Sequence, residues 1–221
     1  MGNQRIPSEL EAKLLVQTER DMRAIARLTH LGRHRLRTRG VARLHSIYVD
    51  TSDFTLARHR VALRLRSDAG RWEATAKWEG RVAGAVHERP ELTVALNAKP
   101  RLPFVLPDGP LRARLGTLVA ARPLRPILIT DIHRRRFDVL APRTAGKEQP
   151  IAELALDRVR LRAPGSGGTA AAYCEIEIER LHGARRDVVD MARVLRQRFD
   201  LTPSRDSKFA RGLALLFGRK P

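Results

Sequence analysis

The sequence predicts an α+β fold in which eight strands form one long, curled sheet with helices packed outside it. Three observations lead to this prediction. Apolar and polar residues alternate with period two in eight separate segments, as they do in half-buried strands. Segments with the period of a helix lie between and after them, and most of the polar strand faces are charged. A sheet of that many strands tends to curl or to close into a barrel.

The first predicted strand, residues 9–16, alternates leucine, alanine and valine with the charged residues Glu9, Glu11 and Lys13. Two carboxylates and an ammonium therefore stand in one line on its polar face. In isolation, such a face is most simply a solvated surface with a weak ion pair. The same construction recurs in the later strands, and this recurrence favours a functional interpretation.

The seven further strands are predicted at residues 44–50, 61–66, 71–78, 86–94, 127–140, 151–161 and 173–179. In the last of them the alternation is sharpest, because Glu175 and Glu177 lie on one face and Cys174 and two isoleucines on the other. We therefore interpret Cys174 as a thiol packed in the core. In the strand over residues 127–140, the late apolar residues fix one face, so Arg134 and Arg136 take the other. Arg135 remains available for that face as well.

Helical periodicity predicts helices at residues 18–31, 54–59, 111–121, 187–199 and 208–216. The segment over residues 33–43 holds so many positive charges that we predict a solvated loop there. Because the helices must cover the apolar faces of the strands, the charged faces should turn inward. That arrangement inverts the ordinary small barrel, whose interior is filled with apolar side chains.

The inward-facing set combines clustered cations with clustered carboxylates. It comprises Lys13, Arg64, Arg66, Lys77, Arg89, Arg134 and Arg136, together with Glu9, Glu11, Glu73, Glu91, Glu153, Asp157, Glu175 and Glu177. Unpaired buried charge is costly, so such an interior needs ion pairs and a charged ligand. Arginine and lysine match the oxygens of a polyphosphate, and carboxylates match a hard cation such as Mg²⁺ or Mn²⁺. The alternative is a sheet whose charged face is simply solvated.

The composition bounds the partners and the compartment. The 221 residues fit one large domain or two small ones, and 43 Lys and Arg against 24 Asp and Glu give a formal charge of +19. Such an excess indicates a polyanionic partner, although 5% aromatic residues argue against stacking on single-stranded bases. One cysteine, no apolar run near the N-terminus and no membrane-spanning window lead us to expect a cytoplasmic protein with no membrane partner.

The ordered set of motifs resembles the CYTH superfamily, the triphosphate tunnel metalloenzymes. Glu9-Leu10-Glu11-Ala12-Lys13 is similar to its ExExK signature, which is a weak motif alone. The resemblance continues in family order through Tyr48-Val49-Asp50-Thr51, Leu63-Arg64-Leu65-Arg66, Thr75-Ala76-Lys77, Arg89-Pro90-Glu91, Glu153 with Asp157, Glu175-Ile176-Glu177 and Ser207-Lys208. Since it spans nearly the whole chain, we expect a single domain of this kind over residues 1–221.

The resemblance implies an eight-stranded antiparallel β-barrel, a triphosphate tunnel, with helices packed outside. It implies substrate-binding roles for Lys13, Arg64, Arg66, Lys77, Arg89, Arg134, Arg136 and Lys208. It implies metal-binding roles for Glu9, Glu11, Asp157, Glu175 and Glu177. Among these residues, Glu11, Lys13 and Glu177 would be catalytic. Lys208 enters this set only through the resemblance, and Arg134 with Arg136 is its least secure match.

The implied activity is metal-dependent hydrolysis of a linear triphosphate, most simply of tripolyphosphate to pyrophosphate and phosphate with Mg²⁺ or Mn²⁺. Adenylate cyclase and thiamine triphosphatase, both found in the same family, stay open, as does a non-catalytic polyphosphate or nucleic-acid binder. A pure polyanion binder has no use for carboxylates facing its ligand, so we expect an enzyme and do not expect nucleic acid as the partner. Steering of anionic substrate is one hypothesis for the surplus surface charge.

The branch that the chain resembles most is that of the bacterial inorganic triphosphatases. In that branch the domain is often fused to a helical, basic CHAD domain, which we do not expect here because the sequence ends at Pro221. A homodimer is compatible with the resemblance, but no sequence feature locates an interface.

Overall fold

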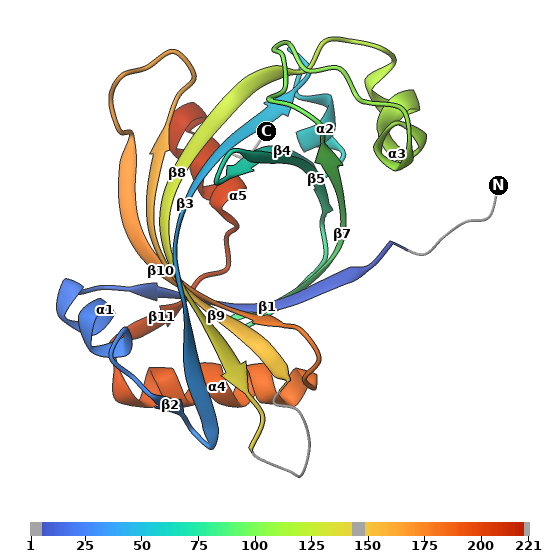
Figure 1. Cartoon of the computed structure of the whole chain (residues 1–221). Helices are drawn as coiled ribbons and strands as arrows, with labels where there is room; N and C mark the ends of the chain where they lie inside the picture. The colour runs from blue at the N-terminus through green and yellow to red at the C-terminus, as the bar shows by residue number, and fades with distance from the viewer. Residues whose placement is uncertain (1–5, 143–148, 219–221) are drawn as a thin grey trace.

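Eight antiparallel strands close into a ring in the computed structural model, which describes residues 6–142 and 149–218 (Figure 1). Around the ring they follow in the order β1 (Ser8–Val16), β10 (Ala171–Arg180), β9 (Pro150–Arg162), β8 (Arg125–Leu140), β3 (His34–Asp50), β4 (Val61–Asp68), β5 (Arg71–Trp78) and β7 (Val86–Leu96). Pairing of β7 with β1 closes it. The ring is not an even barrel, because β3 has 17 residues and β8 has 16, while β4 and β5 have eight each. The predicted fold class is confirmed.

The other described elements are short strands and helices. They are α1 (Glu19–Ile25), β2 (His30–Leu31), α2 (Thr55–Arg58), β6 (Arg81–Ala83), α3 (Pro110–Val119), α4 (Arg185–Arg198), β11 (Leu201–Pro203) and α5 (Lys208–Phe217). Each predicted helix is present, although the first ends early because residues 30–31 pair with β3 instead. In the described part of the chain, no helix combines the length and the apolar character needed to cross a membrane.

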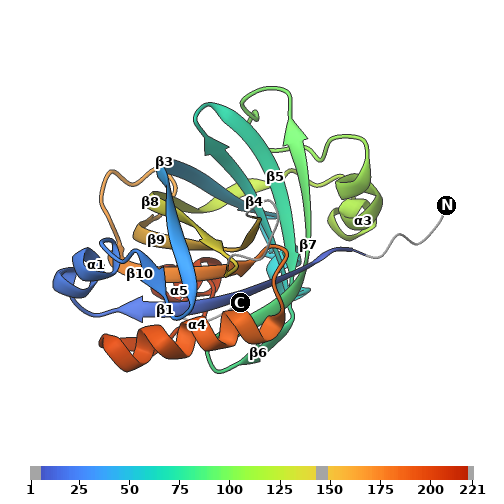
Figure 2. The same cartoon turned by 60° about the horizontal axis from the view of Figure 1, so that its bottom comes forward.

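The apolar strand faces point outward, where helices cover them. Leu14 and Ile176 of the ring pack with Met191 and Leu195 of α4, which lies across β1 and β10 (Figure 2). A second cluster joins β4 and β5 to α2 and α3, around Leu63. Burial of these faces leaves the opposite, charged faces to the inside of the ring, as the alternation predicts.

The prediction of a solvated loop over residues 33–43 was wrong. This segment is the first half of β3 and pairs with β8. Leu36 packs into the outer core, while Arg37 donates to Asp138 at 2.8 Å and Arg39 donates to Glu153 at 3.1 Å. A register shift next to Gly40, whose φ is +95°, interrupts the alternation and hid the strand.

Helix α5 lies on the inner side of the ring, whereas we expected the helices outside. Its Leu213 packs with Leu128, Ile132 and Val159, which belong to the inner face of β8 and β9. The approach is close, since a Cβ on Gly212 would lie 2.4 Å from Leu128 Cδ2. One end of the ring is therefore filled by a helix and an apolar cluster, and the charged interior is confined to the remainder.

Candidate functional site

A cavity of about 180 Å³ lies inside the ring, next to the start of α5. Ten of the residues predicted for the site line it: Glu9, Glu11, Lys13, Arg64, Arg66, Lys77, Arg89, Arg134, Glu177 and Lys208. They come from β1, β4, β5, β7, β8, β10 and α5. Two further predicted residues, Asp157 and Glu175, are fully buried behind this lining. The ring thus brings together side chains that are up to 199 positions apart.

Glu177 is the centre of the most buried charge cluster. Its Oε1 accepts from Lys13 Nζ and from Lys208 Nζ, each at 2.7 Å, and Arg134 donates to its Oε2. Burial alone would raise the pKa of Glu177, but the charges of Lys13, Lys208 and Arg134 outweigh it and hold that pKa well below its usual range. Glu177 therefore stays ionised, and it holds three cations at the cavity wall.

Lys208 reaches this cluster because α5 begins at that residue. The Ser207 hydroxyl caps the helix by accepting from the Ala210 N–H at 3.1 Å. The Lys208 ammonium then lies 3.0 Å from Asp157 Oδ2 and also contacts Glu175. Burial would lower the pKa of Lys208, yet the surrounding carboxylates raise it well above its usual value. Strand parity contains no signal for a residue at a helix start, so only the motif resemblance points to it.

Asp157, Glu175 and Glu177 form an acidic group whose chemistry fits a metal ion. One carboxylate oxygen from each lies within 4.8 Å of the others. Oxygen donors of this kind suit Mg²⁺ or Mn²⁺. Glu175 Oε2 is buried without a hydrogen-bond partner, and burial raises the pKa of Glu175. Asp157 in turn accepts two hydrogen bonds of 2.7 Å from Arg134, so the group is already partly neutralised by cations.

A second cluster lies where β7 meets β1. Glu9 accepts from Lys77 at 2.8 Å and from Arg89 Nε at 3.1 Å, and Arg89 Nη2 donates to Glu11 at 2.7 Å. Glu9 and Arg89 are direct partners in the strand register. Although burial opposes it, the charges of Glu11 and Glu9 raise the pKa of Arg89. Glu91 also contacts Lys77, at 2.6 Å, so both cations of this cluster have carboxylate partners.

The β4 wall of the cavity is different, because its two arginines have few partners. Arg64 is 8% exposed, its nearest carboxylate is Glu73 at 3.7 Å, and its Nε is buried without a hydrogen bond. Among the described residues, Arg66 donates only to the Ser46 hydroxyl, at 3.2 Å. Burial, together with the positive charges of Arg64 and Arg134, lowers the pKa of Arg66 to about 10. Positive charge is in excess here, so this wall is complementary to an anion.

The three consecutive arginines of β8 take three different positions. Arg134 is buried in the lining, Arg135 is exposed with its guanidinium 5.4 Å from the Phe137 ring centre, and Arg136 donates to Asp68 at 2.7 Å. Arg136 does not line the cavity, contrary to the sequence-based expectation. It shares the inward parity of Arg134, but Asp68 at the end of β4 holds it away.

The structure adds one charged residue to the lining that the sequence-based set omits. Glu179 lines the cavity, and burial together with the nearby Glu9 and Glu11 raises its pKa to about 7. It follows Glu175 and Glu177 on the same face of β10, so strand parity was the signal that could have found it.

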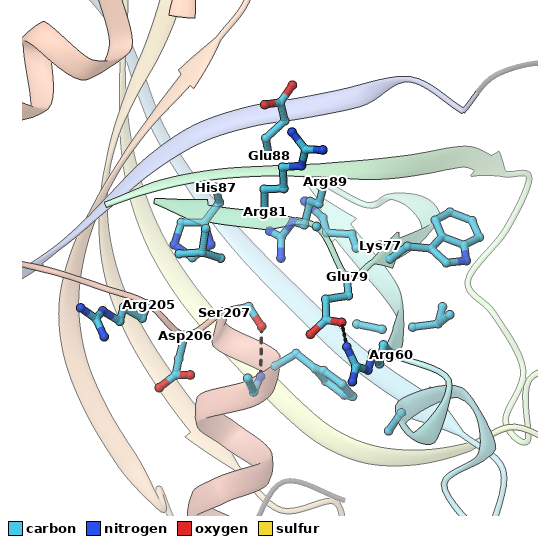
Figure 3. A pocket seen from close by; sticks show the side chains of 18 of the residues that line it. Arg60, Lys77, Glu79, Arg81, His87, Glu88, Arg89, Arg205, Asp206 and Ser207 are labelled. Atoms are coloured by element: carbon cyan, nitrogen blue, oxygen red, sulfur yellow. Dashed lines mark hydrogen bonds and ion pairs between the residues drawn. The ribbon is translucent and has the colours of Figure 1, made fainter. Parts of the chain in front are cut away.

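A second cavity of about 440 Å³ adjoins the first and shares Lys77, Arg89 and Ser207 with it. Figure 3 shows side chains from β5, β7 and the start of α5 around this space. Its walls are mixed, since Trp78 and Phe209 lie among charged residues. The inner cavity therefore opens toward a larger and partly apolar space.

A closed antiparallel ring that encloses paired cations and carboxylates defines a charged-tunnel protein. The chain belongs to the CYTH domain family, which matches residues 8–213. It is 29% identical over 177 residues to the inorganic triphosphatase of Haemophilus influenzae, an alignment that covers 78% of this chain. The chain spans about half the length of that relative, of which 46% is covered.

Two solved structures share the fold. One is a protein from Hippeastrum that was studied as an adenylyl cyclase and has a dominant triphosphatase activity; the TM-score is 0.56 with 16% identity, over 96% of each chain. The other is a candidate adenylate cyclase from Bacillus halodurans, with a TM-score of 0.58 and 20% identity over 92% of this chain and 96% of that one. At these identities the likeness concerns the fold.

Proposed function

We propose that this protein is a metal-dependent triphosphatase that hydrolyses a linear triphosphate, with inorganic tripolyphosphate as the first choice of substrate. The observation that carries the proposal is the excess of positive charge at Arg64 and Arg66 in the wall of the inner cavity. Arginines that are withdrawn from water with few carboxylate contacts are costly unless an anion completes them. Arginine offers paired N–H groups that match phosphate oxygens.

The remaining cations have partners that a substrate can replace. Lys13, Lys77 and Arg89 now contact glutamates, and phosphate oxygens would take the place of those carboxylates. Together with Arg134 and Lys208, these cations would stabilise the charge that develops on the transferred phosphoryl group and on the leaving pyrophosphate. Glu11, which lines the cavity, is our choice for positioning the attacking water.

The released carboxylates are the natural ligands for the metal. Glu9, Glu11 and Glu177 line the cavity, and Asp157 with Glu175 lies directly behind it. A divalent cation held by these groups would neutralise charge on the triphosphate oxygens. Triphosphate would take the cations away from the carboxylates, and the metal would bind the carboxylates that are left. The two ligands should therefore bind cooperatively, so triphosphate should bind more tightly in Mg²⁺ or Mn²⁺ than in chelator.

The comparisons support this proposal in one respect. The relative from Haemophilus influenzae carries the name inorganic triphosphatase, and it aligns with most of this chain. A single domain over residues 1–221, a cytoplasmic location and a homodimer stay predictions.

A second candidate is a triphosphate that carries an organic group, such as ATP or thiamine triphosphate. The adjoining cavity of about 440 Å³ favours it, because Trp78 and Phe209 provide apolar surface next to the cations that the two cavities share. Cyclisation of ATP would consume the nucleotide without releasing phosphate, so it is separable from hydrolysis by its products.

The test measures phosphate release from tripolyphosphate, ATP and thiamine triphosphate, each with Mg²⁺, Mn²⁺ or chelator. We expect metal-dependent release from tripolyphosphate, and a fall by on the order of 10²–10⁴ in Glu11→Gln. Glu19→Gln is the matched control, since Glu19 lines neither of these two cavities and contacts the exposed Arg158. Release that survives chelation, or no turnover of any of the three compounds, would contradict the proposal.

A further inference from the structure

The outer face of β3, β8 and β9 carries a second concentration of positive charge, away from the inner cavity. We call it the outer basic face and define it by Arg43, His45, His133, Arg158 and Arg160. These residues line an open hollow of about 1020 Å³. At this end of the ring, Figure 1 shows α5 against the inner side of the sheet, and α1 reaches the hollow on the outer side with Glu19.

The strand register sets these basic side chains side by side. Arg43 of β3 is the direct partner of His133 of β8, and His133 is the direct partner of Arg158 of β9. Neighbouring strands are about 4.8 Å apart, so three basic groups form a row across the sheet. The guanidinium groups of Arg43 and Arg158 therefore lie on either side of the His133 imidazole, on an exposed face.

The carboxylates within the hollow are already engaged. Asp131 contacts His45 at 2.6 Å and Arg162 at 3.2 Å, and Glu19 contacts Arg158 at 2.7 Å. Within residues 6–142 and 149–218, Arg43, His133 and Arg160 have no ion pair. The face therefore keeps a net positive charge after its internal pairs are formed.

The wall between this face and the inner cavity is solid. Leu44, Ile132 and Val159, on the same stretches of strand, point to the other side of the sheet and pack with α5. A ligand on the outer basic face thus cannot reach the inner cavity through the sheet. The face is a separate site, and an inference about it does not depend on the proposed triphosphatase activity.

We propose that the outer basic face binds inorganic polyphosphate, a linear polyanion longer than the inner cavity can hold. The guanidinium groups of Arg43 and Arg160 match phosphate oxygens. The lining has no exposed Phe, Tyr or Trp ring for a base to stack on, because its Tyr173 is half-buried and packs under Arg211. The lining also lacks the exposed aromatic or aliphatic anchors that a protein partner needs.

The test is binding of fluorescently labelled long-chain polyphosphate, followed by anisotropy on the whole chain. Chelator prevents turnover, and excess tripolyphosphate fills the inner cavity. The variant combines Arg43→Glu with Arg160→Glu. The matched control combines Arg186→Glu with Arg196→Glu on α4, where both arginines are exposed and have no ion pair in the described residues.

We expect about a tenfold or larger loss of affinity in the outer-face variant and about a twofold or smaller loss in the control. The slope of log affinity against log salt should fall by about 1 for each phosphate contact removed. Hydrolysis of tripolyphosphate should be unchanged. If circular dichroism shows that the double variant does not fold, Arg160→Gln alone replaces it, with Arg196→Gln as its control.

Three outcomes would overturn the proposal. Equal losses of polyphosphate affinity in the variant and in the control would show that only the overall charge of the protein matters. Displacement of polyphosphate by tripolyphosphate would place it in the inner cavity. Tighter binding of a single-stranded or duplex RNA of equal charge to the same arginines would make nucleic acid the partner.

Discussion

The inner cavity and the outer basic face are both rich in arginine, yet they treat their charges differently. Inside, Glu177 alone contacts three cations, and most cations have a carboxylate within 3.2 Å. Outside, Arg43 and its register neighbour His133, as well as Arg160, have no ion pair in the described residues. Removing a charge from water is expensive, so a buried charge needs a partner and an exposed one does not. An unpaired arginine is therefore a stronger sign of a ligand inside than outside.

Replacement of Glu177 by glutamine tests how much the buried ion pairs of the inner cavity stabilise the protein, and it has the largest expected effect. It leaves Lys13, Lys208 and Arg134 facing one another without their shared carboxylate. Breaking a buried ion pair by removing one partner lowers the free energy of unfolding by about 3–5 kcal/mol. Chemical denaturation measures this fall in the free energy of unfolding.

Glu19→Gln is the control for that variant, because it breaks the exposed pair with Arg158 on the outer side. A loss of about 0–1 kcal/mol is expected there. Equal losses in the two variants would show that burial does not distinguish the two regions.

Replacement of Arg66 by glutamine sharpens the comparison, since Arg66 is the inner cation that contacts no carboxylate in the described part of the chain. Its removal should leave the free energy of unfolding unchanged or raise it, because an uncompensated buried charge disappears. Affinity for tripolyphosphate should fall by about 1.5–3 kcal/mol, the range of a hydrogen bond to a charged group. Isothermal titration measures the affinity.

Arg136→Gln provides the contrast to Arg66→Gln. Arg136 is paired with Asp68 and does not line the cavity, so its removal should change the affinity little. A larger loss of affinity in Arg136→Gln than in Arg66→Gln would mean that the substrate lies elsewhere in the ring.

The alternation of side chains along the strands explains how much of the fold and of the candidate site could be predicted from the sequence. Because side chains alternate strictly in a strand, the inward residues of β1, β4, β5 and β10 follow from the sequence once the strands are known. Parity fails where the strand has a bulge, as at Gly40, or where the backbone is a helix, as at Lys208. It also assigns only a face, so it could not separate Arg134 in the cavity from Arg136 beside Asp68. Pairing choices of that kind depend on tertiary neighbours that no local pattern contains.

Gly212→Ala tests the helix that fills one end of the ring. An added Cβ would lie 2.4 Å from Leu128 Cδ2, so either the buried Leu128 side chain or α5 must shift. Overpacking of this kind lowers the free energy of unfolding by about 1–3 kcal/mol. Because Lys208 is at the start of the same helix, tripolyphosphate affinity should fall as well.

The control for this variant has the opposite sign. In α3, a Cβ on Gly116 would meet the flexible side chain of Arg112 at 3.4 Å, so Gly116→Ala should stabilise the protein by about 0.5–1 kcal/mol. Thermal unfolding of both variants measures the sign of each stability change. A stabilising effect at Gly212 would show that α5 is not tightly seated inside the ring.

The contrast between buried and exposed groups extends to histidine, with the smallest expected effect. His87 is buried, and its Nε2 lies 2.7 Å from the Ser204 carbonyl oxygen. Burial lowers the pKa of His87, an effect that the Ser204 hydrogen bond opposes and Lys13 reinforces. The unfolded chain then binds a proton more readily than the folded one. This contribution to stability is complete above the unfolded pKa of about 6.5 and is lost as the pH falls below it.

His87→Gln should therefore flatten the fall in the free energy of unfolding between about pH 7 and pH 5.5, measured by denaturation at each pH. The exposed His30 of β2 is the control, and His30→Gln should leave the slope unchanged. The two variants carry the same change in side chain and differ in burial. If both flattened the curve equally, the pH dependence would come from loss of a histidine in general, and the buried position of His87 would contribute nothing to it.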